Sequence, residues 1–171
     1  MDSPRAPEEP APSPVCRAFL LKFGRTPDPA RRRRILAACV RADRTWTEEL
    51  LWESLADPNE GLRDTVAREL CRRGALRLDW ALRRLRLPPW YARSAVLAVI
   101  GRRRMREALA GVGGAVEDAN ADVRRAAAEA LGELGGEEAL RLLVRLKKDA
   151  NPYVRAAAEE AIGKTSGVRF S

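Results

Sequence analysis

The chain contains no histidine among its 171 residues, and this absence excludes much enzyme chemistry. Histidine is the commonest general base and the commonest zinc ligand, so histidine-based catalytic triads and most zinc sites are ruled out. The three cysteines, Cys16, Cys39 and Cys71, are odd in number and widely spaced. This spacing argues against a disulfide framework or a cysteine-rich metal site and favours reduced thiols in a cytoplasmic protein. We therefore expect no catalytic residue, no metal and no cofactor.

Long apolar runs are also missing from the sequence. The run Phe19-Leu20-Leu21 is too short for a secretory signal, and no run approaches membrane-spanning length. The segment 1–14 contains five prolines and no apolar periodicity, so we expect it to be disordered. The length and composition of the rest of the chain predict a single elongated domain with no membrane segment.

The sequence does contain a tandem repeat with a period of about 30 residues. An arginine recurs at the same place in successive units, at Arg63, Arg93, Arg124 and Arg155. Apolar or small residues three and seven places after it lie on one helical face and predict an amphipathic helix. In a degenerate first unit, Arg33 occupies the corresponding place. A second helical pattern precedes each of these segments, so each unit is predicted to be a pair of helices.

An Asp-x-Asn sequence lies between the two predicted helices of three units. It begins at Asp57, Asp118 and Asp149, and Leu87-Pro88-Pro89 replaces it in a further unit. Aspartate and asparagine side chains hydrogen bond to nearby backbone donors in tight turns and cap the following helix. The motif therefore predicts a turn that leads directly into the second helix of each pair.

This pattern resembles the HEAT-like repeat family, in particular its short, alanine-rich bacterial members, which are also found in phycobilin lyase subunits. The residues that carry the resemblance are Asp118, Asn120, Val123, Arg124, Ala127, Ala128, Leu131 and Gly132, repeated as Asp149, Asn151, Val154, Arg155, Ala158, Ile162 and Gly163. The resemblance implies an all-α, right-handed α-solenoid of about five antiparallel helix pairs. Its units would span 15–43, 44–74, 75–104, 105–135 and 136–164, followed by a tail at 165–171.

The family resemblance also bears on activity. This family mostly supplies binding surfaces, so we expect the chain not to be an enzyme. Iron-dependent HEAT enzymes that use histidine–glutamate pairs are excluded because the chain has no histidine. In such stacks the turn aspartate and the helix arginine form a ladder of charge-assisted hydrogen bonds between neighbouring repeats. The expected ladder residues, which we interpret as structural, are Asp57, Arg63, Arg93, Asp118, Arg124, Asp149 and Arg155.

Function is expected on the concave side, which the second helices line. The exposed positions one and two turns after the ladder arginine include Arg68, Arg72, Arg102, Glu129 and Glu160, so the groove changes from basic to acidic along the chain. We interpret these residues as contacts for a partner protein.

Three aromatic residues extend this partner-binding hypothesis. Trp80 lies about 150 degrees from the centre of the buried stripe of its helix, which predicts an exposed tryptophan beside arginines. Such a pair is typical of a protein-binding hot spot, although a neighbouring repeat or the N-terminal segment could cover Trp80 instead. Trp90 and Tyr91 replace polar turn residues, and they either extend the patch or fill the space beside Pro88 and Pro89.

Three functions follow from these observations. The leading hypothesis is a non-catalytic scaffold that binds a protein partner through the concave face. The alternative is a nucleic-acid-binding protein, because residues 1–104 hold 22 cationic and 13 acidic side chains whereas residues 105–171 hold 10 and 11. The third hypothesis, a lyase-type subunit that holds a tetrapyrrole or another small ligand, depends only on the resemblance. The alanine-rich last repeat also predicts a weak homodimer through that end.

Overall fold

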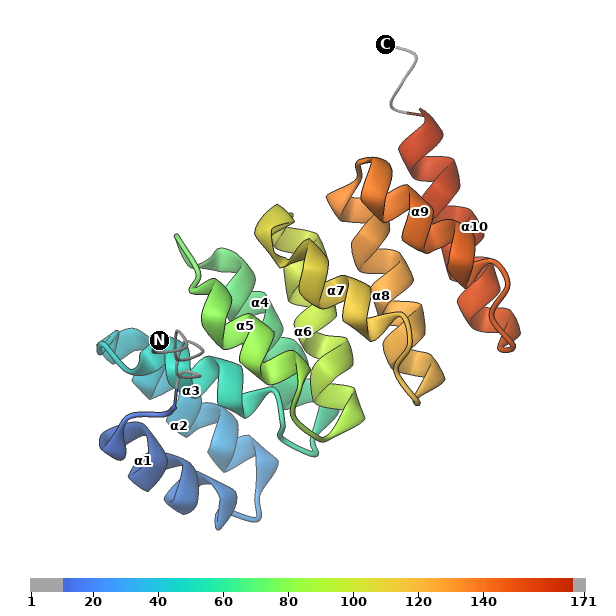
Figure 1. The fold of residues 1–171 in the computed structure, drawn as a ribbon. Helices are drawn as coiled ribbons and strands as arrows, with labels where there is room; N and C mark the ends of the chain where they lie inside the picture. Colours follow the sequence, from blue (N-terminus) through green and yellow to red (C-terminus); the bar gives the residue numbers. More distant parts are fainter. Residues whose placement is uncertain (1–10, 168–171) are drawn as a thin grey trace, which may run out of the picture.

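The computed structural model describes residues 11–167, which form helices and turns without a strand. The helices follow one another in pairs along the chain (Figure 1). The pairs are α1 (Pro14–Gly24) with α2 (Pro29–Ala42), α3 (Thr47–Ser54) with α4 (Glu60–Arg72), α5 (Leu78–Leu85) with α6 (Trp90–Arg103), α7 (Leu109–Ala115) with α8 (Ala121–Leu134), and α9 (Glu137–Leu146) with α10 (Pro152–Gly167). The short 3-10 helix η1 (Arg106–Ala108) precedes α7.

The two ends of the chain differ from the boundaries expected from the sequence. Most of the segment predicted to be disordered, 1–14, lies outside the described residues, and Pro14 is already the first residue of α1. Of the predicted tail 165–171, the part up to Gly167 continues helix α10, and the rest lies outside the described residues. Within the described part of the chain, none of the helices combines the length and the apolar character needed to span a membrane.

The helices form two layers, as the array in Figure 1 shows. We call α1, α3, α5, α7 and α9 the outer helices, and α2, α4, α6, α8 and α10 the inner helices. In the second half of the chain the inner helices pack more extensively against one another than the outer helices do. Gly101 allows this approach between α6 and α8, because a Cβ atom there would lie 3.0 Å from the Cα atom of Ala130.

The inner helices α4 and α8 each bury an apolar stripe in a core that continues from repeat to repeat. Leu62, Val66 and Leu70 are fully buried on α4, at spacings of four residues. Val123 and Leu131 are fully buried in the same way on α8. Burial of such a stripe against neighbouring repeats supplies the hydrophobic free energy that a single helix pair lacks.

The Asp-x-Asn turns are closed by two side-chain acceptors. In the turn before α8, Asp118 Oδ1 accepts a hydrogen bond from the backbone N–H of Asn120 at 2.9 Å, and Asn120 Oδ1 accepts from the N–H of Asp122 at 2.9 Å. The asparagine therefore satisfies a free N–H group at the start of the helix. In the third repeat, which lacks this motif, Arg84 Nη2 instead donates to the carbonyl oxygen of Pro88 at 2.6 Å.

Candidate functional site

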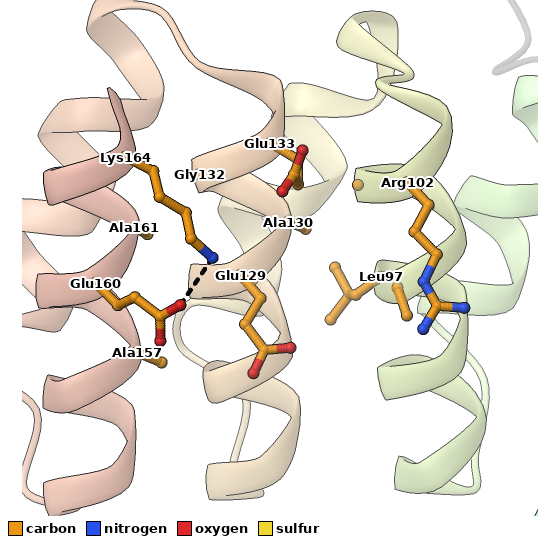
Figure 2. Close-up of a pocket in the computed structure, with 12 residues that line it drawn as sticks. Leu97, Arg102, Glu129, Ala130, Gly132, Glu133, Ala157, Glu160, Ala161 and Lys164 are labelled. Atoms are coloured by element: carbon orange, nitrogen blue, oxygen red, sulfur yellow. Dashed lines mark ion pairs between the residues drawn. The ribbon is translucent and has the colours of Figure 1, made fainter. Parts of the chain in front are cut away.

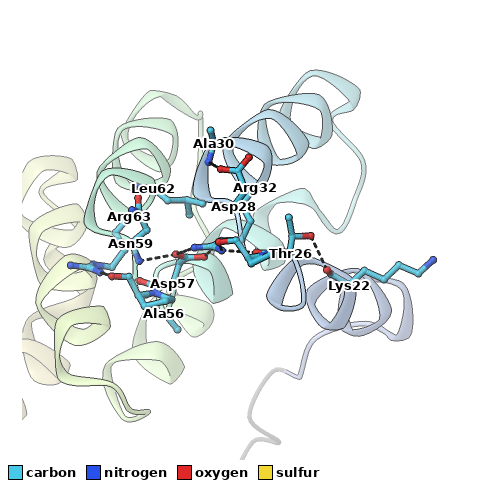
Figure 3. A network of polar contacts seen from close by, with 12 residues as sticks. Lys22, Thr26, Asp28, Ala30, Arg32, Ala56, Asp57, Asn59, Leu62 and Arg63 are labelled. Carbon is cyan, nitrogen blue, oxygen red and sulfur yellow. Dashed lines mark hydrogen bonds and ion pairs between the residues drawn. The ribbon is translucent and has the colours of Figure 1, made fainter.

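A ladder of bidentate arginine–aspartate pairs joins repeats along the array. In each pair the guanidinium of one inner helix donates two hydrogen bonds of 2.7–2.9 Å to the aspartate in the next turn, 25 residues later. Figure 3 shows the first pair with its surrounding contacts. The three pairs are Arg32 with Asp57, Arg93 with Asp118, and Arg124 with Asp149.

The first ladder pair corrects the register predicted for the first repeat. Arg32, not Arg33, binds Asp57, and the Arg33 side chain is exposed. With this shift of one residue, Asp28 takes the place that Asn59 has in the second repeat. Asp28 accordingly caps α2 by accepting hydrogen bonds from the N–H groups of Ala30 and Arg31.

Two arginines expected in the ladder bind no carboxylate within the described residues. Arg63 would meet Leu87 in the next turn, where other repeats have aspartate. Its guanidinium instead donates to the carbonyl oxygens of Asp57 and Pro58, both at 2.9 Å, and lies 4.5 Å from the ring centroid of Tyr91. Arg155 likewise donates to the backbone of its own turn, at residues 149 and 150.

Two aspartates of the ladder, Asp118 and Asp149, have lowered pKa values. The hydrogen bond from Arg124 lowers the pKa of Asp149, and the N–H of Asn151 acts in the same direction. Burial would raise the pKa of Asp118, but the hydrogen bonds from Arg93 and the backbone outweigh burial, so this pKa is also lowered. Partly buried pairs with two hydrogen bonds each hold neighbouring repeats together, and their arginines stabilise the ionised form of Asp118 and of Asp149.

Two adjoining hollows form a groove along the inner helices. One, of about 330 Å³, lies between α4, α6 and α8. The other, of about 270 Å³, lies between α6, α8 and α10 and is drawn in Figure 2. Both are lined by Ala98, Arg102 and Glu129, so they are continuous. We call the combined surface the inner groove.

The inner groove exposes one large aromatic ring, that of Trp90. Its side chain is 42% exposed, and the ring lies edge-on to Tyr91 with centroids 5.7 Å apart. Tyr91 is less accessible, because Arg63 covers one face of its ring and its hydroxyl donates to the carbonyl oxygen of Ala56 at 3.4 Å. The first residue of α6 therefore presents a tryptophan that contacts Tyr91 and is open to solvent.

The prediction that Trp80 is exposed is wrong, since only 1% of this residue is accessible. The guanidinium groups of Arg77 and Arg83 lie over its ring, with centroid distances of 5.6 and 5.4 Å. Glu53 of α3 forms an ion pair with Arg83 and fixes it there. The helical-wheel argument considered only the face of α5 that packs on α6, whereas in the array α5 also packs on α3 of the preceding repeat.

The structure brings five of the predicted contact residues together in the inner groove. These are Trp90, Tyr91, Arg102, Glu129 and Glu160. Arg68 and Arg72 are exposed on α4 but do not line either hollow. In Figure 2 the carboxylates of Glu129 and Glu133 on α8 stand between Arg102 on α6 and the Glu160–Lys164 ion pair on α10.

Four further charged residues of the groove were not predicted from the sequence. They are Glu60, Asp64, Asp122 and Arg125. Glu60 lies three positions before the ladder arginine of its repeat, and Asp64 and Arg125 lie one position after theirs. The prediction used only the positions one and two turns after each ladder arginine. Adding the position three residues before it and the position one residue after it would have found three of the four missed residues.

The cysteines do not provide a reactive group for this site. All three are free thiols, and none of them lines the inner groove. Burial, with a smaller effect of Glu49 and Glu53, raises the pKa of Cys16 to about 12. Burial also raises the pKa of Cys39 and of Cys71. The thiols are therefore protonated at neutral pH and are weak nucleophiles.

The helix pairs, capped turns and ladder define an α-helical repeat protein. A sequence model of HEAT repeats matches residues 78–163, which is half of the chain. The chain therefore belongs to the HEAT repeat family, and the predicted all-α repeat fold is confirmed. No curated protein sequence matches it.

Among the solved structures that this chain resembles, two are compared with it below. The chain is similar to the complex of CpcE and CpcF of phycocyanin lyase from Nostoc sp. PCC7120, with a TM-score of 0.60 and 18% identity over 98% of this chain and 71% of that chain. It is also similar to human deoxyhypusine hydroxylase in complex with glycerol, with a TM-score of 0.57 and 24% identity over 70% of this chain. The chain spans 43% of the length of the hydroxylase. At these identities the likenesses establish the fold alone.

The comparisons correct the expectation that the chain is not an enzyme. That expectation assumed that proteins of this repeat type mostly supply binding surfaces. Both similar structures are enzyme-type HEAT proteins, a lyase and a hydroxylase by name. Membership of the family therefore does not separate this chain from the enzymes, and the inference from fold to absence of activity fails.

Proposed function

We propose that the chain is a protein-interaction subunit whose inner groove binds a segment of a partner protein. The observation that carries the proposal is an open groove that crosses four inner helices and contains the half-exposed ring of Trp90. Tryptophan is among the residues in which binding energy concentrates at protein interfaces. Tyr91 packs edge-on against this ring and leaves part of the ring open to a partner.

The shape of the inner groove favours an extended partner over a small ligand. A small-molecule site encloses most of the surface of its ligand. Here Glu129, Glu160 and Lys164, which line the second hollow, remain exposed along its rim. A tetrapyrrole, the ligand considered in the third hypothesis, would therefore stay largely solvated, whereas a polypeptide could lie along the whole groove.

Nucleic-acid binding has less support than the net charge suggests. Many arginines of the first three repeats are engaged within the protein, as Arg32 is with Asp57 and Arg73 is with Asp43. Arg103 donates to the carbonyl oxygens of Cys71 and Gly74. Exposed arginines do occur on α2, at positions 31, 33 and 34, but α2 contributes nothing to the two hollows. Phosphate binding would therefore use a different surface.

A peptide selection tests the proposed groove. Displayed random peptides are selected on the natural chain and then tested on Ala98→Phe, which places a bulky ring where the two hollows meet. Val144→Phe, at an exposed position of the outer helix α9, is the matched control. We expect peptides that bind the natural chain and the control but not Ala98→Phe. Circular dichroism melting confirms that both variants are folded. The proposal is refuted if the selection yields no peptide whose binding is lost in Ala98→Phe.

The homodimer predicted for the last repeat is a separate proposal. Tyr153 and Ala156 on α10 are exposed, so this end offers apolar surface that a second copy could cover. Sedimentation at high micromolar concentration measures the oligomeric state of the chain directly. Observation of monomer alone would contradict it without affecting the proposed groove.

A further inference from the structure

The inner groove has the opposite charge to the rest of the protein. The whole chain carries a formal net charge of +8. The lining of the two hollows, in contrast, contains six carboxylates and four cationic side chains. The carboxylates are Glu60, Asp64, Asp122, Glu129, Glu133 and Glu160, and the cations are Arg63, Arg102, Arg125 and Lys164.

Most of the cationic side chains in the groove are already engaged. Arg125 contacts Glu129 at 2.5 Å, and Lys164 contacts Glu160 at 2.8 Å. Arg63 donates to two backbone carbonyl oxygens and lies over Tyr91. Two of the four cations are therefore paired with carboxylates of the groove, whereas Arg63 keeps its charge but is held against its own turn and Tyr91.

Two carboxylates beside Trp90 remain available. Glu60 and Asp64 lie one helical turn apart at the start of α4, and they line the same hollow as Trp90. Neither forms an ion pair within the part of the chain that the structure describes. Asp122, at the start of α8, lines this hollow as well and has a longer ion pair, of 3.8 Å, with Arg125. An exposed indole ring flanked by carboxylates matches the requirements of a cation, which the ring face and the negative charges both attract.

We propose that the inner groove recognises a basic polypeptide segment, with an arginine or lysine side chain seated against Trp90 between Glu60 and Asp64 on α4 and Asp122 on α8. This inference rests on the proposed function and specifies the chemistry of the partner. The ring contributes a cation–π contact and apolar area, and the carboxylates contribute charge-assisted hydrogen bonds. A nucleic-acid backbone would meet the same carboxylates with like charge and would be repelled.

Defined peptides test the inference by fluorescence anisotropy. The probe is a labelled dodecapeptide with four arginines in a glycine, serine and alanine background, and its neutral control carries citrulline, which keeps the shape of arginine without its charge. Analogous glutamate and oligothymidine probes complete the set. We expect the arginine peptide to bind about tenfold more tightly than the citrulline peptide, with an affinity that falls as salt is added.

Three variants locate the binding site of the arginine peptide. Trp90→Ala should weaken its binding about threefold through the lost cation–π contact, and Glu60→Gln with Asp64→Asn should weaken it about fivefold. The matched control is Glu107→Gln with Glu117→Gln, which removes the same charge at positions that do not line the groove. This control should bind the arginine peptide like the natural chain.

The inference and the proposed function fail in different ways. The inference is overturned if the arginine peptide does not bind, or if the citrulline peptide binds equally well. It is also overturned if the arginine peptide binds equally to all three variants, or if oligothymidine binds more tightly than the arginine peptide. Groove-dependent peptides from the selection could still be neutral or acidic, and the proposed function would then stand with a different partner chemistry. If the selection yields no groove-dependent peptide at all, the proposed function itself fails.

Discussion

One glycine position tests how the repeats stack, because it recurs every 31 residues with different surroundings. Gly132 lies in α8 and Gly163 is its counterpart in α10. A Cβ atom at Gly132 would lie 2.8 Å from the Cβ and 3.2 Å from the Cα of Ala161 on the next inner helix. A Cβ atom at Gly163 would meet no atom within 4 Å. The same glycine-to-alanine change therefore overpacks one site and leaves the other open.

The magnitude follows from two opposing terms. Alanine is favoured over glycine in a helix interior by about 1 kcal/mol, and this gain applies to both sites. Overpacking of a close helix contact costs about 1–3 kcal/mol, and this cost applies only at Gly132. The helix term cancels in the comparison, so Gly132→Ala should be less stable than Gly163→Ala by about 1–3 kcal/mol. In absolute terms Gly163→Ala should be stabilised, whereas Gly132→Ala should be neutral or destabilised.

Thermal unfolding followed by circular dichroism measures this difference. For a chain of this size, 1 kcal/mol corresponds to about 2–4 °C in Tm. We expect Gly163→Ala to melt above the natural protein and Gly132→Ala to melt below Gly163→Ala. Equal melting temperatures for the two variants would refute the argument, because they would mean that α8 and α10 do not approach as closely as the structure shows.

The remaining predictions concern the ladder, the thiols and the tryptophans. Asp149→Asn should lower the free energy of unfolding in urea by about 1.5–3 kcal/mol, since it breaks the charged pair with Arg124. The folded pKa of Asp149 is lowered from its ordinary value of 3.8, so its contribution is present above that pH and is lost as the pH falls through the lower folded value. The difference between the natural protein and Asp149→Asn should therefore shrink in acid; an unchanged difference would refute the assigned shift. Cys16, whose pKa is raised to about 12, should react with a thiol reagent at pH 8 only after unfolding, and rapid labelling of the folded protein would contradict its burial. Acrylamide should quench the fluorescence of Trp90 but not that of Trp80, so Trp80→Phe should remove only fluorescence that acrylamide does not quench; loss of a quenchable component in this variant would count against the burial of Trp80.

The sequence by itself determined the repeats and their turns, because these depend on contacts within a few residues. The Asp-x-Asn motif closes its own turn, as the bonds at Asp118 and Asn120 show. The buried stripe that contains Val123 and Leu131 follows from helical periodicity alone. For the same reason the all-α repeat fold could be predicted from the order of the residues.

Tertiary structure decided everything that depends on the neighbouring repeat. The sequence misplaced Trp80, because one helix cannot show that the preceding repeat covers its second face. It also chose Arg33 over Arg32, since only the position of Asp57 on the next turn distinguishes two adjacent arginines. The carboxylates that share a hollow with Trp90 were equally hidden, because Glu60 and Asp64 on α4 and Asp122 on α8 come from different repeats and share one surface only when the helices stack. Local periodicity fixes which face of a helix is apolar, but the stacking of repeats fixes which polar residues share a surface.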